Sequence, residues 1–107
     1  PTIGEEEFDM PVSVTVRPPG NRLHLVFTGN LDISASVPMC ELCRRIGPGV
    51  LLCILDVRRV ERVFDSGIAL LQMLCEHVRR LGGRVVLRGD HPEIARHLAE
   101  IASPSAA

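Results

Sequence analysis

Aromatic residues and lysine are scarce in this sequence. Its 107 residues include no tryptophan, no tyrosine and no lysine, and only three phenylalanines. Proteins that hold single-stranded nucleic acid stack its bases on aromatic rings, and this chain offers few of them. The 12 basic residues are all arginines, and 13 acidic residues nearly cancel them, which leaves a net charge of −1. Because a nucleic-acid binder needs a strong positive field, no nucleic-acid partner is expected.

Long apolar runs and a signal peptide are also missing. No run approaches the ~20 residues needed to cross a bilayer, and the first residues are acidic where a signal peptide is basic and then apolar. We therefore expect a cytoplasmic location and no direct insertion of this segment into a membrane. The acidic N-terminal end and the Ser/Pro/Ala-rich C-terminal end are typical of linkers, so the chain is a candidate segment of a longer polypeptide.

The cysteines are too few and too scattered for a disulfide framework. All four fall within apolar patterns and are interpreted as reduced core thiols: Cys40, Cys43, Cys53 and Cys75. An alternative is that Cys40 and Cys43 form a redox or metal-binding pair. They lie inside a predicted helix, away from its N-terminus, and no second Cys/His pair has zinc-site spacing. No metal ligand and no cofactor are predicted.

No motif typical of an enzyme is found. The sequence has no recognisable Ser/His/Asp or Cys/His set, no phosphate-binding loop of the P-loop type and no pair of acids placed in one apolar pocket. The four histidines share no spacing and are interpreted as surface or capping residues: His24, His77, His91 and His97. We therefore predict no catalytic residue and a protein that is not an enzyme, with weak nucleotide binding left open.

The apolar patterns predict one α/β domain at residues 12–102, between tails at 1–11 and 103–107. Strands are predicted at residues 12–16, 22–28, 50–56 and 84–88. Helices are predicted over residues 36–46 and 66–81, and after a capping box at residues 90–93. The expected architecture is a mixed four-stranded sheet, in which an N-terminal antiparallel hairpin precedes right-handed βα units, with about three helices.

The segment from Val60 to Leu71 carries the strongest functional signal. A short predicted loop leads there from the buried strand into the most apolar helix, and Ser66 stands where this helix begins. A phosphate on Ser66 would lie against unpaired backbone N–H groups and the positive end of the helix dipole. The alternative is that Asp65 or Ser66 only caps the helix.

These residues resemble the STAS domain, the fold of the anti-sigma-factor antagonists. That family has the pattern Asp-x-x-x-Val-x-x-x-Asp-Ser-(Ser/Thr)-Gly-(Leu/Ile), in which a partner kinase phosphorylates the second Ser/Thr. The residues that match it without gaps are Asp56, Val60, Ser66, Gly67 and Ile68. Two positions depart from the pattern: Phe64 replaces an Asp, and Asp65 replaces the first Ser.

A second stretch, Gly29-Asn30-Leu31-Asp32, resembles the x-Gly-x-Leu-Asp turn of the same family, and the resemblance implies that it lies near the Ser66 loop. From the residues alone, Gly29 and Asn30 favour a turn, and Asp32 or Ser34 suits the cap of the following helix. Ala69 and Met73 lie on the flank of the second helix in line with Ser66. They extend the predicted partner-binding set, which is Asp32, Phe64, Asp65, Ser66, Gly67, Ala69 and Met73.

The resemblance implies a regulatory protein–protein interaction module with Ser66 as its phosphorylation site. The implied partners are an anti-sigma factor or a serine kinase. STAS domains also occur as cytosolic domains of sulfate-type anion transporters and as small subunits of lipid-transport ATPase complexes, and both stay open as alternatives. In a transporter-linked domain, the fixed charge of Asp65 beside Ser66 would suit a switch held in one state.

Overall fold

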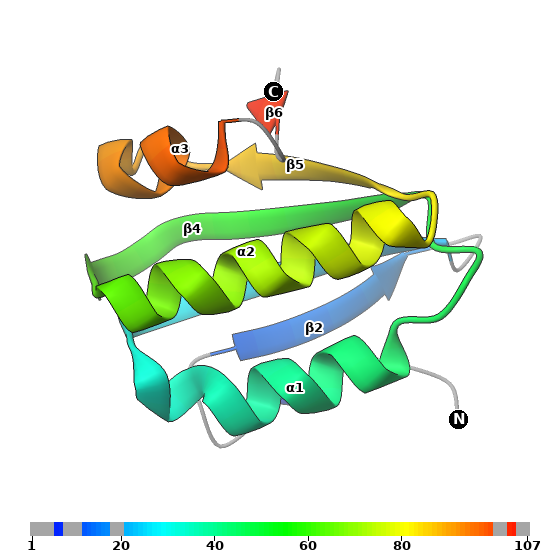
Figure 1. Cartoon of the computed structure of the whole chain (residues 1–107), viewed down its shortest axis with the longest axis horizontal. Coiled ribbons are helices and arrows are strands. Elements are labelled where there is room, and N and C mark those ends of the chain that lie inside the picture. The colour runs from blue at the N-terminus through cyan, green and yellow to red at the C-terminus, as the bar shows by residue number, and fades with distance from the viewer. Residues whose placement is uncertain (1–5, 8–11, 18–20, 100–102, 105–107) are drawn as a thin grey trace.

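The computed structural model describes residues 6–7, 12–17, 21–99 and 103–104. These residues form one mixed sheet with helices on one side (Figure 1). The sheet has six strands in sequence order: β1 (Glu6–Glu7), β2 (Val12–Arg17), β3 (Arg22–Leu31), β4 (Leu52–Val63), β5 (Arg84–Arg88) and β6 (Ser103–Pro104). Antiparallel pairing joins β1 to β2 and β2 to β3, whereas β3, β4, β5 and β6 run parallel to one another.

The helices connect the parallel strands. A short 3₁₀ turn, η1 (Ile33–Ala35), precedes α1 (Ser36–Arg45) between β3 and β4, and α2 (Asp65–Arg80) links β4 to β5. A third helix, α3 (Pro92–Leu98), follows β5. Figure 1 shows α1 and α2 side by side across one face of the sheet. The buried side chains of α3, Ile94 and Leu98, join the same core.

The core lies between this helical layer and the sheet. Alternate side chains of β3 point into it, so that Leu23, Leu25 and Phe27 are buried while the residues between them are only half-buried. A strand with one face covered shows this alternation because successive side chains point to opposite faces. The larger buried side chains of α2 recur at the helical spacing of one apolar face: Ile68, Leu70, Leu71, Leu74, Cys75 and Val78.

Strand β4 extends much further than its sequence suggests. The sequence predicts that the strand ends at Asp56, but the structure continues it to Val63. Its pairing with β3 is irregular at two places. Between the pairs Val26↔Asp56 and Thr28↔Arg59, and again between Gly29↔Val60 and Asn30↔Arg62, β4 advances one residue more than β3. Such bulges break the alternation of buried and exposed side chains, which is why the pattern after Asp56 resembles a loop.

The predicted α/β class and the three helices are confirmed. The predicted sheet, which had four strands and began with an antiparallel hairpin, is wrong because the sheet has six strands among the described residues. Three parallel strands, β3, β4 and β5, form its centre, and antiparallel pairing continues through β1 at one edge. The two shortest strands, β1 and β6, lie within the residues expected to be tails. The rest of those tails lies outside the described residues.

Candidate partner-binding site

The N-terminus of α2 is left open by its own side chains. Phe64 is the N-cap residue, with φ −111° and ψ 164°, and no side chain caps the helix. The Phe64 N–H donates to the carbonyl oxygen of Leu31 at 2.9 Å, and the Ile68 N–H donates to the carbonyl oxygen of Phe64 at 3.0 Å. The N–H groups of Asp65, Ser66 and Gly67 therefore have no acceptor within the helix.

Ser66 is the second residue of α2 and is half-buried, while Asp65 is the first residue and is exposed. The sequence predicted that the helix begins at Ser66 and left open that Asp65 or Ser66 caps it. The structure contradicts both details, because the helix begins at Asp65 and neither side chain caps it. The acid still lies in the first turn, where its charge interacts favourably with the helix dipole.

Gly67 brings the end of β3 against this first turn. It is buried, and a Cβ built on it would lie 2.2 Å from the carbonyl oxygen of Leu31. Only a residue without a side chain allows the helix to approach the strand so closely. The turn that contains Asp32 therefore lies beside the helix end that contains Ser66.

Asp32 itself acts within its own turn. Its carboxylate accepts a hydrogen bond from the Ser34 N–H at 2.9 Å and another from the Ser34 hydroxyl, so that it caps η1. These side-chain and backbone hydrogen bonds lower the pKa of Asp32. The geometry agrees with the turn-and-cap role expected from the residues alone.

Exposed apolar side chains occur at the N-cap of α2 and on the two elements that contact this helix, η1 and α1. Phe64 is 46% exposed, and two others are not among the residues predicted from the sequence: Ile33 in η1 at 67% and Val37 in the first turn of α1 at 71%. We call Ile33, Val37, Phe64 and Ser66 the Ser66 patch. Among the described residues, the other large exposed apolar side chain is Leu51, at the opposite end of β4. A helical wheel of α1 would have revealed Val37, because it lies off the buried stripe that includes Met39 and Leu42.

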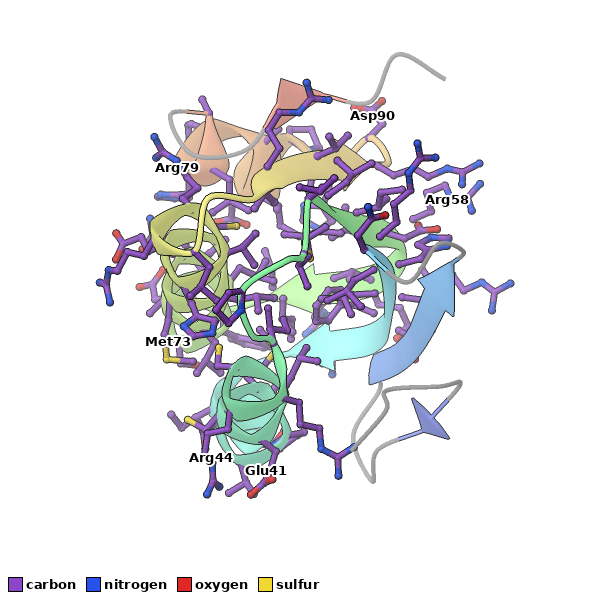
Figure 2. All side chains as sticks on the ribbon, turned by 90° about the vertical axis from the view of Figure 1, so that its right-hand side faces the viewer. Glu41, Arg44, Arg58, Met73, Arg79 and Asp90 are labelled. Atoms are coloured by element: carbon purple, nitrogen blue, oxygen red, sulfur yellow. The ribbon has the colours of Figure 1, made fainter. Side chains whose placement is uncertain are left out.

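Ala69 and Met73 line a groove between α1 and α2. The groove holds about 480 Å³, and we call it the α1–α2 groove. Its walls are Cys40, Cys43, Ala69, Gln72, Met73, Glu76, His77 and Arg80. Ala69 is exposed as expected, but Met73 is half-buried and packs against the core. Met73, which lies on the helical side of the molecule (Figure 2), is thus less accessible than Ala69.

The thiols differ in exposure. Cys53 and Cys75 are buried as predicted, whereas Cys43 is half-buried and Cys40 is exposed, which corrects the expectation of four core thiols. Burial raises the pKa of Cys43, Cys53 and Cys75, the last of them to about 12. These three thiols are therefore protonated at neutral pH and are poor nucleophiles. Among the described residues, no group of three or more His, Cys, Asp or Glu side chains could hold a metal ion.

Asp56, which matches the first position of the family pattern, lies on the opposite side of the sheet from the helices. It is 3% exposed and accepts hydrogen bonds from the Arg58 N–H at 3.2 Å, Nε at 3.0 Å and Nη2 at 2.8 Å. His24 Nε2, at 3.2 Å, donates a fourth, so His24 is not the plain surface residue that the sequence suggested. Burial raises the pKa of Asp56, but these hydrogen bonds and the Arg58 charge outweigh it and lower the pKa to about 2.

The role of Asp56 is thus structural. It fixes both the backbone and the side chain of Arg58 at the first bulge of β4, and eight residues separate it from the start of α2 at Asp65. The structure does not bring Asp56 to the Ser66 patch.

The sequence matches no family model, and no curated protein matches it. In the part of the chain that the structure describes, no helix is both long enough and apolar enough to cross a membrane.

Solved structures, in contrast, match in fold. The anti-sigma factor antagonist SpoIIAA in its unphosphorylated form matches with a TM-score of 0.72 and 15% identity, over 90% of this chain and 88% of that one. An antisigma-factor antagonist STAS domain from Rhodobacter sphaeroides matches with a TM-score of 0.57 and 18% identity, over 71% and 82%. The murine anion transporter Slc26a9 matches with a TM-score of 0.61 and 15% identity, over 94% of this chain but 20% of the transporter. The chain therefore has the SpoIIAA-like fold of STAS domains.

Proposed function

We propose that this chain is a cytoplasmic regulatory module that binds a protein partner through the Ser66 patch, in the manner of an anti-sigma-factor antagonist. The observation that carries the proposal is that exposed Ile33, Val37 and Phe64 side chains lie on η1, on α1 and at the N-cap of α2, whose N-terminus no side chain caps. Apolar side chains gathered at one site gain free energy when a partner covers them. The proposed activity is binding, and no residue is assigned a catalytic role.

Phosphorylation of Ser66 is proposed to control this binding. A phosphate adds about −1.5 to −2 charges and three acceptor oxygens at neutral pH. The free N–H groups of the first turn of α2 and the helix dipole would stabilise it, while the exposed Asp65 carboxylate would repel it. The phosphate would lie beside Phe64. An apolar partner surface that covers Phe64 would then remove water from the phosphate charge, and this cost in free energy would weaken binding.

The proposed partner is an anti-sigma factor or a serine kinase, and the adjoining α1–α2 groove is proposed to extend the interface along Ala69 and Met73. The test uses the whole chain and the purified anti-sigma-type serine kinase encoded nearest to its gene. Binding is measured by calorimetry for the parent chain, for Ile33→Ser and for Leu51→Ser. The control is matched because Ile33 is 67% exposed and Leu51 is 61% exposed, at opposite ends of the sheet.

We expect Ile33→Ser to weaken binding by about tenfold and Leu51→Ser to leave it unchanged. Equal effects of the two variants, or no binding by the parent chain, would contradict the proposed face.

The transporter match supports one alternative, in which the chain is the cytosolic domain of an anion transporter. A small subunit of a lipid-transport complex is a further alternative on the same fold. In either case the module would contact transporter subunits, and Asp65 would hold the site in one charged state. The coding sequence on either side of this segment separates these alternatives, because a transporter domain is preceded by membrane-spanning helices.

A further inference from the structure

The side of the sheet that carries no helix combines apolar side chains with charged ones. Cross-strand pairing places nine residues in three rows on this side. They are Arg22, Leu52 and Arg84 in the first row, His24, Ile54 and Val86 in the second, and Val26, Asp56 and Arg88 in the third. We call these nine positions the open sheet face. Figure 2 shows Arg58, which pairs with Asp56, on the side of the molecule away from the helices.

The apolar side chains of the open sheet face are incompletely covered. Leu52, Ile54 and Val86 are half-buried, in contrast to their neighbours Cys53, Leu55 and Val85, which point into the core and are buried. A hollow of about 260 Å³ lies over Leu52 and Ile54. It is lined by Arg22, Leu23, His24, Leu52, Ile54 and Arg88.

Three corners of the face carry unneutralised arginines. Asp56 is the one acid among the nine positions, and its carboxylate is already engaged by Arg58 and His24. Within the described part of the chain, Arg22, Arg84 and Arg88 form no ion pair. The face is thus positive, although the whole chain has a net charge of −1.

We propose that the open sheet face binds an acidic amphipathic segment of a partner protein, independently of the Ser66 patch. An apolar stripe of that segment packs on Leu52 and Ile54, and carboxylates on its flanks pair with the corner arginines. The dimensions suit one helix. Strands lie about 4.8 Å apart, so Arg22 and Arg84 are separated by about 10 Å, which is the width of a helix with its side chains.

Other occupants fit this face less well. A second copy of the chain would bring three unpaired arginines against three others, and like charges oppose such an interface. Nucleic acid would pair with the arginines but would offer no apolar surface to cover Leu52 and Ile54. A membrane needs apolar side chains that protrude, whereas these are half-buried beside the exposed Arg22 and Arg84.

The test is a titration of the isotope-labelled full chain, followed by its backbone amide NMR signals. The probe is an acetylated and amidated helical peptide of leucine and glutamate, with leucines on one face. Four comparison probes are used. Two are variants of the peptide, one with lysine in place of glutamate and one with glutamine in place of leucine. The other two are vesicles of phosphatidylglycerol and phosphatidylcholine and a single-stranded oligodeoxynucleotide.

We expect saturable shifts at the amides of Leu52, Ile54 and Val86 with the leucine–glutamate peptide alone. The double variant Arg22→Glu/Arg84→Glu should weaken its binding by at least about tenfold. The control Arg79→Glu/Arg96→Glu changes two arginines that are also exposed, on the helical side, and should have no effect. Well-dispersed spectra establish that each variant is folded.

Two kinds of result would overturn the proposal. One is the absence of any saturable shift with the leucine–glutamate peptide up to about 1 mM, or equal weakening by the control variant. The other is equal or tighter binding of vesicles, oligodeoxynucleotide or the peptide without leucine, which would assign the face to a membrane, to nucleic acid or to charge alone.

Discussion

The Cα of Gly67 and the carbonyl oxygen of Leu31 lie so close that a Cβ on Gly67 would come within 2.2 Å of that oxygen. The same Leu31 oxygen accepts the Phe64 N–H at 2.9 Å. One backbone group of β3 therefore fixes both the N-cap of α2 and the position of its first turn. The Ser66 patch depends on this contact.

Replacing Gly67 with alanine should destabilise the fold by about 2–3 kcal/mol, because backbone must move to relieve the overlap. Gly47→Ala is the control, since nothing lies within 4 Å of a Cβ there. It should change the free energy of unfolding by less than about 1 kcal/mol. Urea unfolding followed by circular dichroism suits this chain, which has no tryptophan or tyrosine for fluorescence. Similar losses in the two variants would contradict the close contact.

An aspartate at Met73 should destabilise the protein by about 1–3 kcal/mol, because Met73 is half-buried against the core and a carboxylate there loses solvation. Ala69→Asp adds the same charge one turn earlier, at an exposed position, and should cost less than about 0.5 kcal/mol. Thermal unfolding measures both. If Met73→Asp were as stable as the parent chain, the packing of Met73 would be wrong.

Asp56 should make the fold sensitive to acid. Its pKa is about 2 in the folded protein, against 3.8 for an unperturbed aspartate, so the unfolded chain takes up the proton first as the pH falls. The stabilisation of about 2 kcal/mol is complete above pH 3.8 and is lost as the pH falls through about 2.

The variant Asp56→Asn should lower the free energy of unfolding at neutral pH by about 2–4 kcal/mol, because Arg58 and His24 lose their charged acceptor. The variant should also make the free energy of unfolding depend less on pH in the acid range. Asp90→Asn, at an exposed position, is the control and should do neither. Unfolding by urea across the acid range distinguishes them, and an unchanged pH profile in Asp56→Asn would refute this role.

Much of the fold can be predicted from the sequence because the local spacing of apolar residues indicates its helices and strands. The buried stripe of α2 follows from the spacing of Leu70, Leu71 and Leu74, and β5 follows from a short apolar run that Gly89 ends. The extension of β4 was not predictable in this way. Its two bulges remove the alternation, and its charged residues are held in the sheet by pairing with Thr28–Leu31, which is a tertiary contact.

The candidate site likewise has features that the sequence predicts and features that it does not. The position of Ser66 near a helix N-terminus follows from the sequence, but the open cap does not, because Phe64 gives no capping signal. The clamp on Asp56 joins His24 and Asp56 across 32 residues of sequence, and no local pattern predicts it. Ile33 was missed because a single apolar residue in a polar turn predicts neither burial nor exposure.

The central claim is that Ser66, at the open end of α2, is the phosphorylated residue of a regulatory switch. The most direct measurement is the mass of the intact chain after incubation with the neighbouring serine kinase and ATP, with the modified residue located by fragmentation. Ser66→Ala and Ser34→Ala are compared with the parent chain, because Ser34 is an exposed serine of the adjoining η1 turn. We predict one added phosphoryl group on the parent chain and on Ser34→Ala, and none on Ser66→Ala. An unmodified parent chain, or a phosphate that persists in Ser66→Ala, would contradict the account.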